Sequence, residues 1–101
     1  MTRPEPARYV AECYWSGIGE GDLPELDRRV HASAAEHDTE AVRYLGSLLI
    51  LADEVLLFLF EGSAAAIGRA ADRAGLPVAR ILRATGTLGP PPVPPVFMEE
   101  R

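Results

Sequence analysis

The 101-residue chain is long enough for one domain with a core of limited size, and 48% hydrophobic residues are too many for a disordered segment. Its formal net charge of −5, without a run of basic residues, disfavours binding to nucleic acid and to anionic membranes. The composition therefore predicts one folded domain whose partners are neither nucleic acid nor membrane.

The cysteine content and the hydropathy pattern predict a cytoplasmic protein. Cys13 is the sole cysteine, which excludes an intrachain disulfide and suits a reducing compartment. The first residues hold no apolar run, so we expect no signal peptide. Asp53 and Glu54 interrupt the longest apolar stretch well short of a membrane span. All ten basic residues are Arg, a bias that indicates a bacterial source.

Periodicity and turn residues divide the chain into six elements. Asp22 and Glu25 have the spacing of a capping box at a helix start, Ser63 is an expected N-cap, and Gly75 an expected left-handed terminator. In chain order the expected elements are a strand at Arg8–Trp15, a helix that begins at Asp22 and ends before a polar connection at Asp38–Glu40, strands at Ala41–Leu51 and Val55–Phe60, a helix at Ala64–Ala74, and a strand at about Arg80–Leu88.

Each helix has a predicted inward stripe at helical spacing. The stripe of the first helix is Leu23, Leu26, Val30 and Ala34, joined by His37 if the helix persists that far. The stripe of the second helix is Ala64, Ile67, Ala71 and Ala74, whose side chains are mostly small enough for close packing on a sheet.

The segment Tyr44–Glu61 is predicted to form a hairpin without the apolar–polar alternation of a strand that has one wet face. The order βαββαβ indicates an α+β, ferredoxin-like fold, with two helices on one face of a four-stranded antiparallel sheet. We expect this domain over residues 1–88 and a Pro-rich tail over residues 89–101. The other sheet face is then apolar and bare, so we expect a homodimer to cover it, or alternatively the tail.

Four short motifs resemble those of a known family: YVAE (9–12), RYLGS (43–47), FLFEGS (58–63) and AGLP (74–77). They are similar, over Arg8 to Leu88, to small bacterial ferredoxin-like proteins of unassigned activity, one of which is described as nickel-binding. The resemblance implies a homodimer on the dimeric α/β-barrel plan and binding of nickel or another divalent metal. Glu12 and Glu61 match acids of the family pattern, whereas Ser16–Gly17 stands where the family often has Pro-Gly.

Glu12 is the first candidate for chemistry because it lies mid-strand on the face expected to be covered by a partner. A buried carboxylate there could act as a general acid or base with a raised pKa, or as a metal ligand. It could instead form an ion pair with Arg43 or Arg83, or lie near the solvated rim. Tyr14 and Tyr44 could supply hydroxyl donors to the same cavity. Alternatively, they are ordinary strand residues whose hydroxyl groups lie in solvent.

His31 and His37 are the candidate metal ligands, since imidazole favours nickel and zinc. Their spacing places the rings about 120° apart on one helix, so a site needs ligands from elsewhere. Alternatively, His37 ends the helix and His31 bonds Asp27, one turn back. Cys13 is expected to be a small core residue and not a nucleophile.

These candidates suggest two functions. A third hypothesis is a structural or regulatory dimer without chemistry. The first is a metal-binding homodimer, with His31 and His37 as ligands. The alternative is a cofactor-free enzyme, an isomerase, cyclase or monooxygenase, acting on a small apolar or polyketide-like molecule between the sheets. Its catalytic candidates are Glu12, Tyr14, Tyr44 and Arg83.

Overall fold

The structure is a computed structural model that describes residues 7–36, 38 and 40–86. The Pro-rich tail and His37 therefore lie outside the described residues. In chain order the elements are β1 (Arg8–Tyr14), the short 3₁₀ helix η1 (Glu20–Asp22), α1 (Leu23–Ala35), β2 (Arg43–Ile50), η2 (Leu51–Asp53), β3 (Val55–Glu61), α2 (Ala64–Arg73) and β4 (Val78–Ala84). The predicted order βαββαβ is confirmed.

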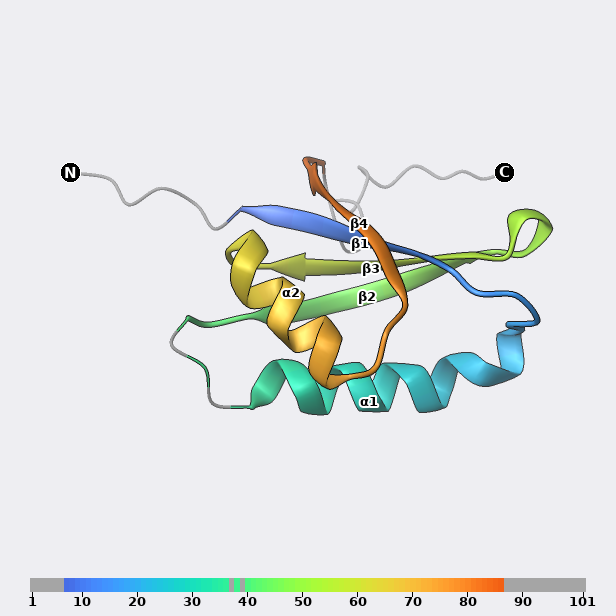
Figure 1. Ribbon diagram of the computed structural model, residues 1–101, viewed down its shortest axis with the longest axis horizontal. Coiled ribbons are helices and arrows are strands. Elements are labelled where there is room, and N and C mark those ends of the chain that lie inside the picture. The colour runs from blue at the N-terminus through green and yellow to red at the C-terminus, as the bar shows by residue number, and fades with distance from the viewer. Residues whose placement is uncertain (1–6, 37, 39, 87–101) are drawn as a thin grey trace, which may run out of the picture.

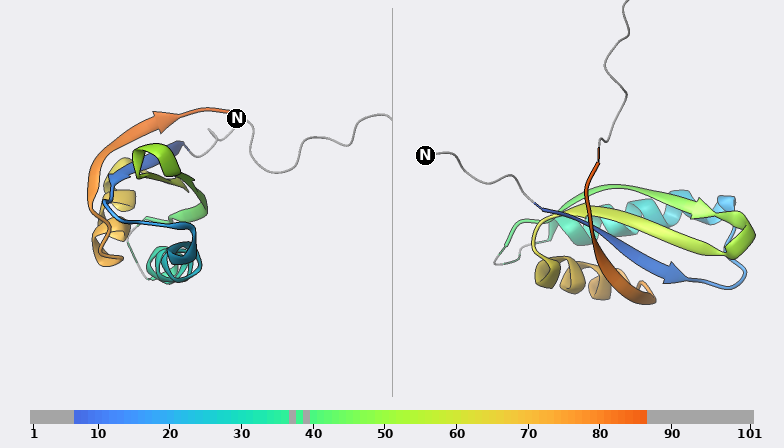
Figure 2. Two further views of the ribbon diagram at one scale, coloured as in Figure 1. Left: turned by 90° about the vertical axis from the view of Figure 1, so that its right-hand side faces the viewer. Right: turned by 90° about the horizontal axis from the view of Figure 1, so that it is seen from above.

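The four strands form one antiparallel sheet in the order β2-β3-β1-β4. The curved sheet covers α1 and α2, which both lie on one side of it (Figures 1 and 2). This layer arrangement and strand order define the ferredoxin-like α+β fold that the sequence predicts. Within the described residues, no helix is long and apolar enough to cross a membrane.

The core lies between the helices and the central strands. Every second residue of β3 points into it, and these are Leu56, Phe58 and Phe60, all fully buried. Ala11 and Cys13 of β1 lie beside them, and α1 and α2 close the core from below with Leu26, Val30, Ile67 and Ala71. Cys13 is therefore a core residue, as predicted.

The helix α1 begins where the sequence predicts, with Asp22 at the N-cap position, but the predicted capping contacts are absent. Asp22 makes no side-chain cap to α1, because its Oδ2 accepts the backbone N–H of Gly19 at 2.9 Å and closes the η1 turn ahead of the helix. Glu25 likewise pairs with Arg28 one turn on and forms no capping box with Asp22. The acidic side chains here shape the loop that leads into the helix.

The second helix starts and ends as predicted. Ser63 Oγ accepts the N–H of Ala66 at 3.1 Å, and Gly75 has a positive φ of 75° beyond the last turn. The predicted inward stripe is wrong at one position, because Ala64 is exposed whereas Ala66 and Ala70 are buried. α2 is thus rotated so that its inward face centres on Ala66, Ile67, Ala70 and Ala71.

Two strand boundaries also shift. β2 begins at Arg43 and β4 runs from Val78 to Ala84, earlier than the predicted Arg80–Leu88. The reason is the pairing with β1, whose first residue, Arg8, lies opposite Ala84. A bulge at Ala79 lets β4 reach back to Val78, opposite Cys13.

Candidate functional site

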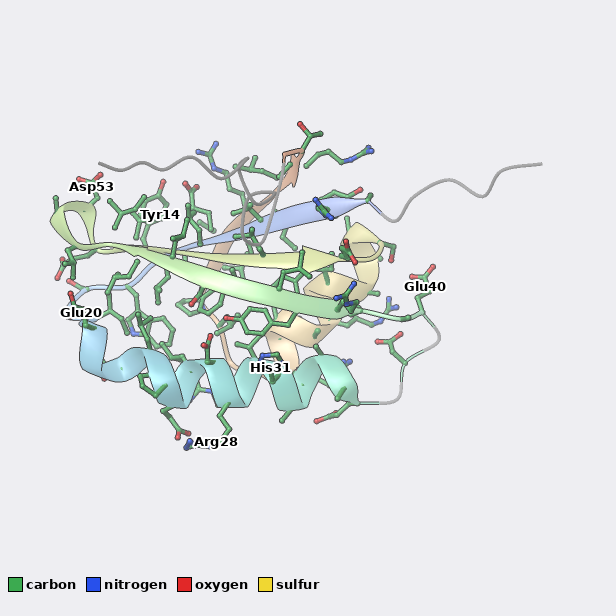
Figure 3. The ribbon with its side chains drawn as sticks, turned by 180° about the vertical axis from the view of Figure 1, so that it is seen from behind. Tyr14, Glu20, Arg28, His31, Glu40 and Asp53 are labelled. Carbon is green, nitrogen blue, oxygen red and sulfur yellow. The ribbon has the colours of Figure 1, made fainter. Side chains whose placement is uncertain are left out.

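The sheet surface turned away from both helices is apolar and exposed. We call it the open face, and its members by strand register are Val10, Glu12, Tyr14, Leu48, Ile50, Leu57, Leu59, Arg80 and Leu82. Tyr14 and Leu48 are 58% and 60% exposed, and Ile50 and Leu82 are 42% and 40% exposed. Figure 3 shows Tyr14 on the side of the sheet opposite to α1. So large an apolar surface is unusual on a monomer.

Glu12 is the polar centre of the open face. Arg80 Nε donates to Glu12 Oε1 at 2.5 Å, and the Tyr14 hydroxyl donates to the same oxygen at 3.3 Å. The hydrogen bond and the charge of Arg80 lower the pKa of Glu12 below its ordinary value. The carboxylate is therefore held ionised, and its pKa is not raised as a buried general acid would require.

The ion-pair partner of Glu12 differs from both predicted ones. Arg80 lies directly opposite Glu12 in the β1–β4 register. Arg43 instead pairs with Glu61 at 3.1 Å. Arg83 lies opposite Tyr9 and follows Leu82, which is on the open face, so its side chain is on the other face of the sheet.

A second ionic group lies at one end of the open face. Glu61 accepts from Arg8 Nε at 3.0 Å and from Arg43 Nη1 at 3.1 Å, and its side chain is only 11% exposed. The three residues come from neighbouring strands in direct register. The open face thus carries paired charges at this end as well as at Glu12.

Tyr44 lies on the helix side of the sheet, away from Glu12. Its hydroxyl donates to Asp27 Oδ1 on α1, which also receives a hydrogen bond from Ser47 Oγ at 3.4 Å. Burial, with the hydrogen bond to Asp27, raises the pKa of Tyr44. Tyr44 therefore serves as a tie between α1 and β2.

Arg83 also lies on the helix side, with its guanidinium 6.0 Å from the centre of the Tyr9 ring. The four catalytic candidates thus form two groups on opposite faces of the sheet. Glu12 and Tyr14 are together on the open face, whereas Tyr44 and Arg83 cannot line a cavity there.

His31 is exposed on α1, on the side that faces the sheet (Figure 3). Its ring packs edge-on against Tyr44, with 4.8 Å between ring centres. The residues that the structure describes contain no group of three or more His, Cys, Asp or Glu side chains that could hold a metal ion. His31 and Asp27 lie one turn apart on α1, and each contacts Tyr44.

Arg80, Asp27 and Ser47 are the contact residues that sequence reasoning did not assign to a site. The sequence pattern marks Arg80 only as the start of a strand, and its partner is 68 positions away. The spacing places Asp27 one turn from His31, yet its hydrogen-bond donors come from β2. Strand register, which decides both contacts, leaves no local pattern in the chain.

The described residues form a ferredoxin-like domain with an apolar open face and one central ion pair. No family model and no curated protein matches the chain. A similar fold occurs in the crystal structure of SCO4226 from Streptomyces coelicolor A3(2), with a TM-score of 0.68. The match covers 81% of this chain and 100% of that chain at 21% identity, so it shows the fold alone. Membership of the family that the four sequence motifs resemble, one member of which is described as nickel-binding, stays a prediction.

Proposed function

We propose that two copies of this chain pack open face to open face and enclose a chamber for a small apolar molecule. Glu12, Tyr14 and Arg80 are the polar groups of that chamber. The observation that carries the proposal is an ion pair set in the middle of an exposed apolar sheet face. A second copy removes this face from water and completes the chamber walls.

The chemistry of the chamber follows from the state of Glu12. A carboxylate held ionised by Arg80 is a poor proton donor near neutral pH and, because its pKa is lowered, also a weak base, but it accepts a hydrogen bond from a ligand. The Tyr14 hydroxyl, 3.3 Å away, supplies a donor. The pair therefore suits a ligand with an apolar body and one hydroxyl group that donates a hydrogen bond to Glu12.

The first experiment measures the dimer. Sedimentation equilibrium of the full chain should give twice the chain mass, and Leu48→Asp should give a folded monomer, because Leu48 is 60% exposed and contributes little to the core. Ala32→Asp, on the exposed side of α1, is the control and should stay dimeric. A monomeric wild-type chain at micromolar concentration would refute the chamber.

The second experiment measures the ligand. Titration with 2-naphthol should show saturable binding, which Glu12→Gln weakens by about tenfold through loss of a charged hydrogen-bond acceptor. Binding of 2-methylnaphthalene, which has no hydroxyl, should be the same in both proteins. Glu20→Gln, exposed in η1, is the matched control. Equal binding of 2-naphthol by Glu12→Gln and wild type would remove Glu12 from the site.

A metal-binding function is a second candidate, supported by the family resemblance and by Asp27 and His31 lying one helical turn apart. Both contact Tyr44, so their positions are restrained. Because two such groups make an incomplete set, the remaining ligands would come from a second copy or from outside the described residues.

The metal proposal has its own test. Calorimetric titration of untagged protein with nickel and with zinc should show binding that His31→Gln weakens at least tenfold. Arg28→Gln, exposed on the same helix, should bind like the wild type. The absence of heat with either metal would rule out this candidate.

A further inference from the structure

A cavity of about 340 Å³ lies on the helix side of the sheet, between the loop that follows β1 and the first turns of α1. Asp22, at the N-cap position of α1, and the helix residues Glu25, Leu26 and Arg29 line it at the i, i+3, i+4, i+7 spacing of one helical face. The loop contributes Trp15 and Ile18. Its volume is within the range of small-molecule sites, and the open face plays no part in it.

The floor of the cavity is apolar and fixed. Leu26 is buried, and Trp15 and Ile18 are half-buried and packed against the core. The backbone N–H of Trp15 donates to the carbonyl of Glu54 at 3.0 Å, and Gly17 N–H donates to the Glu54 carboxylate at 2.9 Å. The hairpin turn thus holds the loop and its indole in place.

The rim carries charges of both signs, two of which are held by backbone contacts. Arg29 Nε donates to the carbonyl of Ala74 at 2.8 Å, which orients the guanidinium. Asp22 also lines the cavity, and its Oδ2 accepts from Gly19 N–H at 2.9 Å, which restrains the carboxylate. A cation and an anion fixed beside an indole surface are complementary to a molecule that carries both charges and an apolar body.

We propose that this cavity binds a small zwitterion with an apolar body, of the class of the apolar α-amino acids. Arg29 receives the carboxylate, Asp22 receives the ammonium group, and the side chain lies on Trp15 and Leu26. The site belongs to a single copy of the chain, and it is independent of the chamber proposed above.

Trp15 is the sole tryptophan of the chain, so intrinsic fluorescence reports directly on the cavity. Titration with L-leucine should change this fluorescence in a saturable way. 3-Methylbutylamine, which lacks the carboxylate, and 4-methylpentanoate, which lacks the ammonium group, should each bind at least tenfold more weakly. Leu48→Asp should bind leucine like the wild type, whatever its oligomeric state.

Variants test the two charged contacts. Arg29→Gln and Asp22→Asn should each weaken leucine binding by about tenfold to a hundredfold, the effect of losing a charged hydrogen bond. Arg29→Lys, which keeps the charge, should retain more affinity than Arg29→Gln. Arg83→Gln makes the same charge change on β4, away from the cavity, and should leave binding unchanged. Circular dichroism checks that each variant is folded.

Two results would overturn the proposal. The first is no saturable change with leucine, isoleucine, valine, methionine or phenylalanine. The second is binding of 3-methylbutylamine as tight as that of leucine, which would make the cavity a site for organic cations.

Discussion

Glu12 and Cys13 are sequence neighbours in β1 whose side chains meet opposite environments. Cys13 points into the core, where burial and then the charge of Glu12 raise the pKa of its thiol to about 11. Glu12 points to the open face, where Arg80 lowers the pKa of its carboxyl. Alternation along one strand therefore makes one group inert and keeps the other charged.

We predict that Cys13 is unreactive in the native protein. Raising the pKa from 9.0 to about 11 lowers the thiolate fraction about 100-fold near pH 8, and the side chain is fully buried. Labelling with a thiol reagent should therefore proceed only through molecules that have unfolded. The same protein in urea should label fully with one equivalent. Rapid labelling of native protein would contradict the assigned core position.

The ion pair of Glu12 should make stability depend on pH. A carboxyl whose pKa is lower in the folded than in the unfolded chain stabilises the fold above the unfolded value, and that contribution is lost as the pH falls through the folded value. Glu12→Gln should thus be less stable than wild type at pH 7. The difference should shrink below the ordinary value of 4.5.

Urea unfolding of both proteins at pH 7 and at about pH 3 measures this difference. Arg80→Gln should show the same pattern, because it removes the other half of the pair. A gap between wild type and Glu12→Gln that is as large at low pH as at pH 7 would refute the assigned role of the charge.

The junction of β3 and α2 depends on backbone conformation at one position. Gly62 has a φ of +144°, and a Cβ built there would lie 2.9 Å from the carbonyl oxygen of Ala41. Its N–H donates to the carbonyl of Ala7, and Ser63 follows at once as the N-cap of α2. The turn thus joins the end of a central strand to the start of a helix within two residues.

We predict that Gly62→Ala lowers the free energy of unfolding by about 1–3 kcal/mol, the cost of a sparsely populated backbone conformation. The close carbonyl adds to this cost. Gly19→Ala is the matched control, because Gly19 has a φ of −138° and open space around it, and it should change stability little. Chemical denaturation compares the two. Similar stability of both variants would contradict the predicted strain.

At the scale of the whole molecule, the sheet has one covered and one uncovered face. The helices bury the side formed by Ala11, Cys13, Leu56, Phe58 and Phe60. The open face keeps large apolar side chains in water, which limits the stability of so small a monomer. A dimer would gain the burial that the single chain lacks.

The proposed dimer predicts a melting temperature that depends on protein concentration. Association stabilises the folded state by mass action, so the wild-type melting temperature should rise as the concentration is raised. Leu48→Asp should melt at a temperature independent of concentration, whereas Ala32→Asp should behave like the wild type. Differential scanning calorimetry over a range of concentrations gives this comparison. A constant wild-type melting temperature would count against association through the open face.

The sequence alone determined the order of elements, the apolar hairpin, the cap at Ser63 and the terminator at Gly75. These features are local, because periodicity, capping and a left-handed turn depend on residues a few positions apart. The sequence also placed Glu12 on the sheet face away from the helices. Side chains alternate between the two faces of a strand, so assigning one residue of β1 to a face assigns the others.

Only the tertiary structure decided which side chains meet. Arg80 rather than Arg43 or Arg83 pairs with Glu12, because the register of β1 with β4 joins segments far apart in the chain. The same register places Arg83 beside Tyr9 and away from Glu12. The packing of α1 against β2 lets the Tyr44 hydroxyl donate a hydrogen bond to Asp27. A shift of one residue in pairing turns a side chain to the other face, and no local pattern specifies that choice.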